Sequence, residues 1–380
     1  MQISDRASRW IETSKGNALP DGTIAAHANA KTIRVKPVLM MREKREELER
    51  FRLAEGATLS IGAGNRARSE EPDPMRTAFE RDRDRILHST AFRRLAGKTQ
   101  VFIFPSDHQR TRLTHALEVS QVATAVARAI GLNDSLTEAI AIGHDCGHGP
   151  GGHASEDAFS QFLPGGFDHA TWGADHTLSD LNLCTETLDG IRNHSWSRPQ
   201  PLTPEGSVVS FADRIAYCAH DLEDAIRAGI ISESEIPDSV AELAGRTRAR
   251  QLSYFISDLV ETVSRTGQIA LSSAAASALA ELREFNYEYI YMRPESLAQS
   301  DTVIRVLSML VEHYAKHPEK MSSVSGEEMD EGSSDYLRIA VGYVSGMTDR
   351  FAFQKAIEYL DLDPSALPFG IDLALGHRVQ

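Results

Sequence analysis

The sequence has little cysteine and no long apolar run. Only three cysteines occur in 380 residues, Cys146, Cys184 and Cys218, and none forms a CxxC pair. This spacing excludes a disulfide framework or a zinc finger and is typical of a protein in a reducing cytoplasm. No apolar stretch of about 18 residues occurs, so we expect no transmembrane helix. The mixed polar start, residues 1–10, predicts that no secretory signal is present.

Basic residues are also scarce relative to acidic ones. The chain has 40 Lys and Arg against 54 Asp and Glu, a formal net charge of -14. Such an acidic surface disfavours non-specific nucleic-acid binding as the main function, and it makes a single-stranded nucleic acid a weak candidate partner. A local basic pocket remains compatible with this acidic overall charge. The 41% hydrophobic content is ample for a large core.

The hydrophobic pattern indicates an all-α protein. Helical periodicities run through most of the chain, and no internal repeat or long alternating strand pattern occurs. The expected parts are a poorly ordered tail over 1–32, a single helical domain over 33–360 and a C-terminal tail over 361–380. Within that domain we expect a metal core at about 81–229 and a C-terminal helical part at about 230–360, with a mobile loop near 315–335.

Three predicted helices matter most for function. The first runs from about Arg112 to Ile130, where apolar residues recur every three or four positions. The second is expected to begin at Ser135, with a capping box to Glu138, and to end near His144. The third spans about Val208 to Ala228 and carries an apolar stripe on one face.

Two histidines and two aspartates on these helices are candidate metal ligands. His115 lies on the first helix, His144 and Asp145 end the second, and Asp213 lies on the third. Imidazole and carboxylate ligands suit one divalent ion such as Mn²⁺, Mg²⁺, Co²⁺, Fe²⁺ or Zn²⁺. The alternative is a chance His-Asp pair, because the chain has 14 histidines and 54 acidic residues.

Five blocks in order resemble one known family. They are RDRDRILHSTAFRRLAGKTQVF (81–102), RTRLTHALEVSQVA (110–123), HDCGHGPGGHASEDAF (144–159), SFADRIAYCAHDLEDAIRAG (210–229) and GYVSGMTDRFAF (342–353). Together they resemble the deoxyguanosinetriphosphate triphosphohydrolase family of the HD-domain superfamily, over about 40–360. The resemblance implies a helical HD-type phosphohydrolase fold with additional C-terminal helices. It also implies one essential metal, held by the four residues named above, and cleavage of a deoxynucleoside triphosphate to deoxynucleoside and tripolyphosphate.

The resemblance also implies residues that bind the substrate. Arg112 and Arg214 are similar to residues that contact phosphate, and Gln100 to one that contacts the deoxyribose 3′ hydroxyl. Tyr217 and Asp221 are similar to sugar-facing residues, and their positions four and eight residues after Asp213 place them on one helix face. The alternatives are a core tyrosine and a solvated charge.

The glycine-rich loop after the His-Asp pair resembles the catalytic region of the family. His148 and His153 match its histidines, and Glu156 matches a carboxylate that orients the imidazole. We expect His153 to donate a proton to the leaving 5′ oxygen or to position the attacking group. The alternative is that either histidine packs against Trp172 or belongs to a second metal site.

Other positions are less determined by the sequence. His169 is similar to a family histidine, although Ala170 follows it where asparagine is usual. The loop also has Cys146, Gly149 and Gly151 at positions where the family has other residues, which leaves base preference open.

Two further groups are open to more than one interpretation. His194 is a pocket residue, a second-metal ligand or, by default, a core or surface histidine. Tyr287, Tyr289 and Tyr291 are candidate aromatic residues of the pocket, but the default interpretation is that at least two of them pack in the core. Residues 81–112 carry eight Arg or Lys and three Asp, which indicates a polyphosphate-binding element or an acid-paired helix.

The leading hypothesis is that the protein is a cytoplasmic, homo-oligomeric enzyme. Its expected partner is its substrate, a deoxynucleoside triphosphate. One alternative is another HD-family phosphohydrolase, acting on a nucleotide monophosphate, a cyclic dinucleotide or an alarmone. The other is a non-catalytic HD scaffold that senses nucleotides.

Overall fold

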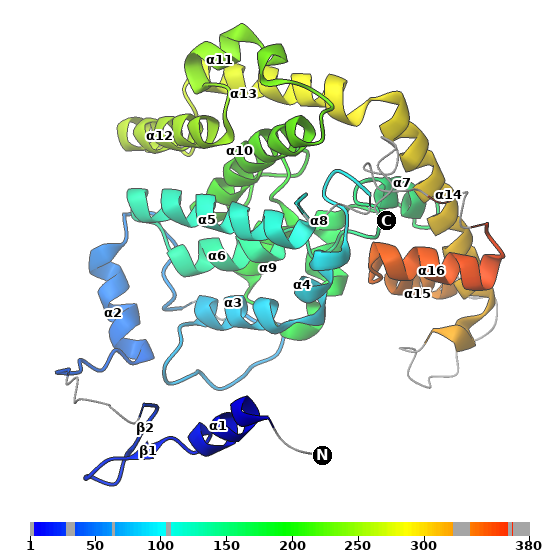
Figure 1. Ribbon diagram of the computed structural model, residues 1–380. Helices are drawn as coiled ribbons and strands as arrows, with labels where there is room; N and C mark the ends of the chain where they lie inside the picture. The colour runs from blue at the N-terminus through cyan, green and yellow to red at the C-terminus, as the bar shows by residue number, and fades with distance from the viewer. Residues whose placement is uncertain are drawn as a thin grey trace. The chain divides into compact units, whose positions relative to one another are not determined.

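Nearly all regular secondary structure in the described part of the chain is helical (Figure 1), which confirms the predicted all-α class. The computed structural model describes residues 4–27, 35–62, 65–103, 108–321, 335–363 and 367. None of the helices in these ranges is long and apolar enough to cross a membrane. Most of the predicted loop near 315–335 and most of the predicted tail at 361–380 lie outside them. The predicted domain boundaries stay predictions.

Contacts divide the chain into two compact units, Met1–Met40 and Met41–Gln380. The first contains helix α1 (Asp5–Thr13) and two short antiparallel strands, β1 (Asn17–Ala18) and β2 (Ile24–Ala25). In this pair Asn17 lies opposite Ala25, and Ala18 lies opposite Ile24.

The second unit contains the remaining helices. The α-helices are α2 (Arg42–Arg52), α3 (Ala78–His88), α4 (Thr90–Arg94), α5 (Arg112–Ile130), α6 (Asp134–Gly143), α7 (Ala154–Ser160), α8 (His169–Trp172), α9 (Thr185–Arg192), α10 (Pro204–Arg227), α11 (Asp238–Ala244), α12 (Arg248–Thr266), α13 (Ser273–Asn286), α14 (Pro294–Lys316), α15 (Asp335–Ser345) and α16 (Asp349–Leu360). Short 3₁₀ turns are η1 (Leu95–Gly97), η3 (Ser179–Leu181), η4 (Glu233–Glu235) and η6 (Pro318–Lys320), and π-helical turns are η2 (Gly173–Thr177) and η5 (Tyr287–Tyr291).

Two hydrophobic clusters organise this unit. In the larger one α5 packs on α6 and α10, α3 and α9 flank α6, and α12 and α13 pack on α10 (Figure 1). The smaller cluster joins α7 to α14, α15 and α16 through buried residues such as Phe159, Leu307 and Val341. Because α7 follows the glycine-rich loop directly, the C-terminal helices hold one side of that loop.

The three predicted helices are present, with two corrected starts. Helix α5 has the predicted bounds, and Gly131 ends it in the left-handed region at φ 75°. The predicted capping box at Ser135 is wrong, because the Asn133 side chain accepts the Ser135 and Leu136 N–H groups and α6 begins at Asp134. Helix α10 begins before Val208, because Thr203 caps it and Pro204 suits the first helical position.

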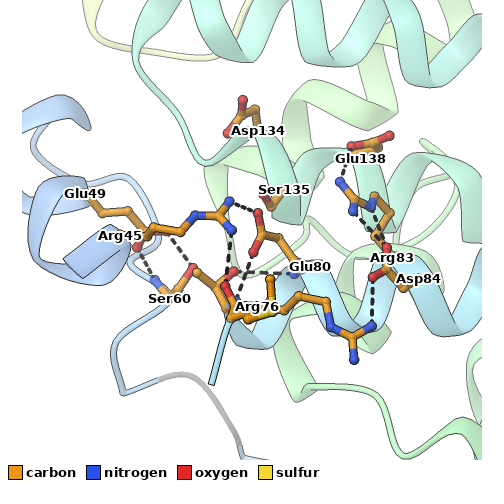
Figure 2. Close-up of polar contacts among 12 residues, drawn as sticks. Arg45, Glu49, Ser60, Arg76, Glu80, Arg83, Asp84, Asp134, Ser135 and Glu138 are labelled. Carbon is orange, nitrogen blue, oxygen red and sulfur yellow. Dashed lines mark hydrogen bonds and ion pairs between the residues drawn. The ribbon is translucent and has the colours of Figure 1, made fainter. Parts of the chain in front are cut away.

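Polar side chains join α2, α3 and α6 on the outside of the larger cluster (Figure 2). Arg45 on α2 donates to Glu80 on α3, and the Glu49 carboxylate accepts both the Ser60 N–H and its hydroxyl at 2.7 Å. Arg83 on α3 bonds Asp84 at 2.8 Å and Glu138 on α6 at 3.4 Å. Glu138, predicted to cap α6, therefore binds an arginine of a neighbouring helix.

Candidate active site

A cavity of about 580 Å³ opens where α5, α10 and the glycine-rich loop meet. All of the predicted site residues except His144 and Glu156 line it. Those that do are Gln100, Arg112, His115, Asp145, His148, His153, Asp213, Arg214, Tyr217 and Asp221. Segments that are far apart in the sequence thus contribute to one space.

The four predicted metal ligands converge beside this cavity. His115 Nε2 lies 3.1 Å from Asp213 Oδ1 and 3.9 Å from Asp145 Oδ2. His144 Nε2 lies 3.5 Å from Asp145 Oδ1 and 3.6 Å from Asp213 Oδ1. The His144 Nδ1 atom is 2.6 Å from the Ala141 carbonyl, and its buried Nε2 has no hydrogen-bond partner. An imidazole held in this way through Nδ1 turns its Nε2 toward the carboxylates, which is the orientation in which metal-binding histidines share an ion with neighbouring ligands.

The electrostatics of this cluster also suit a cation. Burial would lower the pKa of His144, but the Asp145 and Asp213 carboxylates raise it to about 9. Burial would raise the pKa of Asp145, but the Arg112 guanidinium holds it well below the ordinary value. Both carboxylates thus stay ionised in a buried setting, and the residues present fit a divalent ion.

Arg112 connects this cluster to the open space of the cavity. Its Nη1 donates to Asp145 Oδ2 at 2.8 Å, while its buried Nε and Nη2 have no partner. Gly152 lies against it at φ 66°, and a Cβ there would approach Nη2 to 3.0 Å. Glycine therefore leaves room for a guanidinium with two free donors.

The histidines of the loop form one connected group with Glu156. His148 Nε2 lies 3.2 Å from Asp145 Oδ1, and its ring stacks on the His169 ring with centroids 3.7 Å apart. Glu156 Oε1 lies 3.4 Å from His153 Nδ1 but 2.5 Å from His169 Nδ1. His153 has a side chain that is 75% exposed, whereas His148 is buried. Glu156 thus contacts the predicted catalytic histidine, although its closest histidine partner is another.

Two histidines play a larger part in the geometry than the sequence indicated. His169 begins α8, His194 follows α9, and both are buried and line the cavity. Their Nε2 atoms lie 3.3 Å apart. His194 is therefore buried, as the core interpretation expects, and it also lines the cavity, as the pocket interpretation expects. The resemblance gave a signal for His169, but no local pattern placed His194 here.

The residues predicted to face the sugar, Gln100, Tyr217 and Asp221, also line the cavity. Arg283 Nε donates to the Tyr217 hydroxyl oxygen at 2.9 Å, and the Tyr291 hydroxyl donates to Asp221 Oδ2 at 2.5 Å. Gln100 Oε1 and Asp221 Oδ1 are buried without partners. Burial raises the pKa of Asp221 to about 7. Gln100 and Asp221 therefore offer free hydrogen-bonding atoms.

The remaining aromatic residues at the cavity differ from expectation. The Arg214 guanidinium lies 3.5 Å from the centre of the Trp196 ring, and its buried Nε has no partner. Tyr287 and Tyr289 are 50% and 44% exposed, so the default of core packing for at least two of the three tyrosines is wrong. Tyr287 and Tyr291 line the cavity.

Buried hydrogen bonds join three of the blocks that carried the resemblance. Asp349 accepts the Thr99 N–H at 2.9 Å, the Thr99 hydroxyl at 2.5 Å and the Gly151 N–H at 2.9 Å. The buried Lys98 ammonium donates to the carbonyls of His148 and Ser345. The C-terminal helices therefore fix both the loop and the segment before Gln100.

The basic stretch 81–112 is mostly paired with acids, which corrects its interpretation as a polyphosphate-binding element. Arg81 and Arg85 bind Glu70, and Arg83 binds Asp84 and Glu138. Arg110 binds Glu118, Glu223 and Asp224. Of the stretch's basic residues in the described ranges, Arg112 alone lines the cavity.

Comparisons with known proteins agree with this arrangement. The HD domain family matches residues 112–218, and the phosphohydrolase-associated domain family matches residues 269–357. A deoxyguanosinetriphosphate triphosphohydrolase-like protein of Caldanaerobacter subterraneus is 38% identical over 331 residues, covering 83% of this chain and 95% of that protein. One of Clostridium perfringens strain 13 is 40% identical over 328 residues, covering 82% of this chain and 95% of that protein.

A third such protein, of Desulfatibacillum aliphaticivorans, is 37% identical over 340 residues, covering 83% of this chain and 97% of that protein. These matches extend over nearly the whole length of each relative. The chain therefore belongs to the deoxyguanosinetriphosphate triphosphohydrolase-like family of HD-domain phosphohydrolases.

Proposed function

We propose that this protein is a metal-dependent deoxynucleoside triphosphate triphosphohydrolase, which converts dGTP or another dNTP and water to deoxynucleoside and tripolyphosphate. The observation that carries the proposal is the convergence of two imidazoles and two carboxylates beside a cavity into which Arg112 presents unpaired donors. The names of the relatives support the same activity. A cytoplasmic homo-oligomer is part of the proposal.

His115, His144, Asp145 and Asp213 would hold one divalent ion. The unpartnered Nε2 of His144 and the three donor atoms around it support this assignment. When bound, such an ion polarises a phosphate oxygen or a water molecule.

Phosphate and sugar would contact different walls of the cavity. Arg112 Nε and Nη2 and Arg214 Nε have no partner in the protein and suit the oxygens of a polyphosphate. Gln100 Oε1 and Asp221 Oδ1 suit the hydroxyl of a deoxyribose. The ring of Tyr217 would crowd the position of a 2′ hydroxyl and so favour deoxynucleotides.

His153 would deliver the proton to the leaving 5′ oxygen or position the attacking group. Its exposed side chain can reach a substrate in the cavity, and Glu156 lies 3.4 Å from its Nδ1. A carboxylate at that position orients the imidazole and favours its protonated form. His148, which is buried against Asp145, would help to shape the phosphate side of the site.

Product analysis tests the proposal. The full chain is incubated with each dNTP and Mn²⁺ or Mg²⁺, and nucleoside and inorganic phosphates are separated by chromatography. We expect deoxynucleoside and tripolyphosphate in equal amounts. Release of orthophosphate or pyrophosphate instead points to another HD-family phosphohydrolase, and metal-independent nucleotide binding without turnover points to a sensing scaffold.

A further inference from the structure

Arg112 and Arg214, the two arginines predicted to contact phosphate, line the same cavity but are held in place differently. Arg112 donates to the Asp145 carboxylate at 2.8 Å. Arg214 makes no ion pair with any residue of the described ranges, and its guanidinium lies over the ring of Trp196, 3.5 Å from the ring centre. An uncharged ring therefore takes the place of a carboxylate.

This difference decides how much positive charge each arginine offers to a ligand. A carboxylate compensates the charge of the guanidinium that it contacts. An aromatic ring attracts the guanidinium through its electron-rich face but carries no net charge, so the charge of Arg214 stays uncompensated. The buried Nε of Arg214 also has no hydrogen-bond partner. Arg214 thus combines a restrained position with a free charge and a free donor, which suits a phosphate ligand.

The Trp196 ring is itself fixed against the helix that carries Arg214. Its Nε1 donates to the Ser210 carbonyl at 3.1 Å, and the ring meets the Phe211 ring edge to face, with centroids 5.0 Å apart. Ser210 and Phe211 lie on α10, about one turn before Arg214. The ring and the guanidinium therefore share one rigid support.

The segment that carries Trp196 is also anchored at two points. It follows α9, where Asp189 Oδ1 accepts the Asn193 side-chain N–H at 2.8 Å and Asp189 Oδ2 accepts the Leu202 N–H at 2.7 Å. Trp196 lies between these anchors, lines the cavity and is 46% exposed. Because nearly half of this residue is exposed, core packing does not account for its place at the cavity.

We infer that Trp196 is a positioning residue, which holds the Arg214 guanidinium in the orientation that binds the polyphosphate of the substrate. The inference rests on the proposed function, in which Arg214 contacts phosphate. An unrestrained arginine loses side-chain freedom when it binds a phosphate, and the ring removes part of this loss in advance. The effect of the ring therefore follows the phosphates of the nucleotide and not its base.

Substitutions of Trp196 test this role with inorganic tripolyphosphate as the probe. Its binding to the full chain, as the Mg²⁺ complex, is measured by isothermal titration calorimetry. Trp196→Leu should raise the Kd by ~2–30-fold, the range of a cation–π contact. Trp196→Phe keeps an aromatic face and should recover most of the loss. Trp10→Leu, at a tryptophan that is 83% exposed and outside the cavity lining, should match the wild type.

Two further measurements show whether the ring acts through Arg214. In kinetics with each dNTP, Trp196→Leu should lower kcat/KM by the same factor whichever base the nucleotide carries. In a double-mutant cycle, Trp196→Leu should cause no further loss of tripolyphosphate binding when Arg214→Met has already removed the guanidinium. Circular dichroism checks helix content, and Trp196→Met replaces the leucine variant if that variant fails to fold.

The outcomes separate this inference from the proposed function. An unchanged Kd for tripolyphosphate in folded Trp196→Leu refutes the positioning role. A loss of kcat/KM that depends on the base, or an undiminished effect in the Arg214→Met background, also overturns it, because the ring then acts without the guanidinium. If the wild type releases no tripolyphosphate from any dNTP, the proposed function fails, whereas weaker tripolyphosphate binding by Trp196→Leu still supports the positioning of Arg214.

Discussion

The outer network of α2, α3 and α6 and the cavity are both rich in charged side chains, but they differ in how these are paired. In the outer network Arg45, Arg76 and Arg83 each contact a carboxylate (Figure 2). In the cavity Arg112 and Arg214 have buried nitrogens without any partner. Because a buried polar group without a partner is costly, such atoms indicate a place where a ligand completes the bonding.

The difference teaches that charge density alone does not mark a binding site. The stretch 81–112 has a strong local excess of basic residues, yet its acidic partners lie elsewhere in the sequence, at Glu70, Glu138 and Glu223. The cavity has fewer arginines, but two of them, Arg112 and Arg214, keep buried nitrogens without a partner. Matched substitutions in the two regions should therefore have very different effects on turnover.

Removing a carboxylate charge gives the largest contrast. Asp145→Asn keeps an acceptor for Arg112 but loses the charge shared by the proposed metal ligands, so we expect metal to be lost and turnover to fall ~10³-fold or more. Asp84→Asn on α3 breaks only partly exposed pairs, each worth about 0–1 kcal/mol, and should leave both unchanged. Metal analysis and steady-state kinetics check this, and an active, metal-loaded Asp145→Asn variant contradicts the proposed site.

Removing the exposed histidine separates chemistry from metal binding. His153→Ala should lower kcat by ~10²–10⁴-fold with a much smaller change in KM, because a proton-transferring group acts mainly in the transition state. Bound metal should match the wild type. Glu156→Gln should cause a milder loss, since this carboxylate acts through the imidazole. Loss of metal in proportion to activity would show instead that His153 is a ligand.

Removing an arginine compares the two regions directly. Arg112→Ala should lower kcat/KM by ~10–100-fold, the effect of losing a charged hydrogen bond of about 1.5–3 kcal/mol to the phosphates. Arg83→Ala, in the outer network, should change kcat/KM less than about threefold. Kinetics at two ionic strengths provide the check, because equal losses in both variants would mean that general positive charge, not the free donors of Arg112, binds the substrate.

Much of the fold could be predicted because its signals are local. The apolar periodicity between residues 112 and 130 gave α5 its bounds, since the stripe and its end signal lie within the segment itself. The start of α6 was missed because Asn133 and Ser135 are both good capping residues. The choice between them depends on Glu138, which binds Arg83 from α3 and so is not available as a cap partner.

Local sequence patterns account for cavity residues that share a helix, but not for those that only packing brings together. Tyr217 and Asp221 lie four residues apart on α10, so their common face follows from helical geometry. His194 reaches the cavity because α9 packs against α6 and α10, which no local pattern encodes. The same holds for the close contact of Glu156 with His169, which depends on the packing of α8.

Substitution of a residue predicted to face the sugar should change kcat/KM less than substitution of a residue on the phosphate side. If Tyr217 crowds the 2′ position, dGTP should be preferred over GTP by ~10–200-fold in kcat/KM, the range expected for steric discrimination of one small group. Tyr217→Ala should narrow this gap, whereas Tyr217→Phe, which loses only the contact with Arg283, should largely keep it. Comparable kcat/KM values for the two nucleotides in the wild type would remove Tyr217 from sugar recognition.

The smallest expected effect concerns stability, and it tests whether an unpaired cavity atom carries a cost. Burial raises the pKa of Asp221 from 3.8 to about 7, and Asp224 adds to this, while the Tyr291 hydroxyl, His115 and Arg110 oppose it. Because the folded-state pKa lies above the ordinary value, the stabilisation is complete below about pH 4 and is lost as the pH rises through 7.

Asp221→Asn keeps an acceptor for Tyr291 but cannot ionise. The Tm of this variant relative to that of the wild type should therefore rise between pH 5 and pH 8, by ~2–4 °C for each kcal/mol recovered. Asp84→Asn, in the outer network, should show no such rise between the two pH values. Thermal unfolding of the metal-free proteins measures this, and a Tm difference for Asp221→Asn that is independent of pH would mean that the carboxylate is paired or neutral throughout.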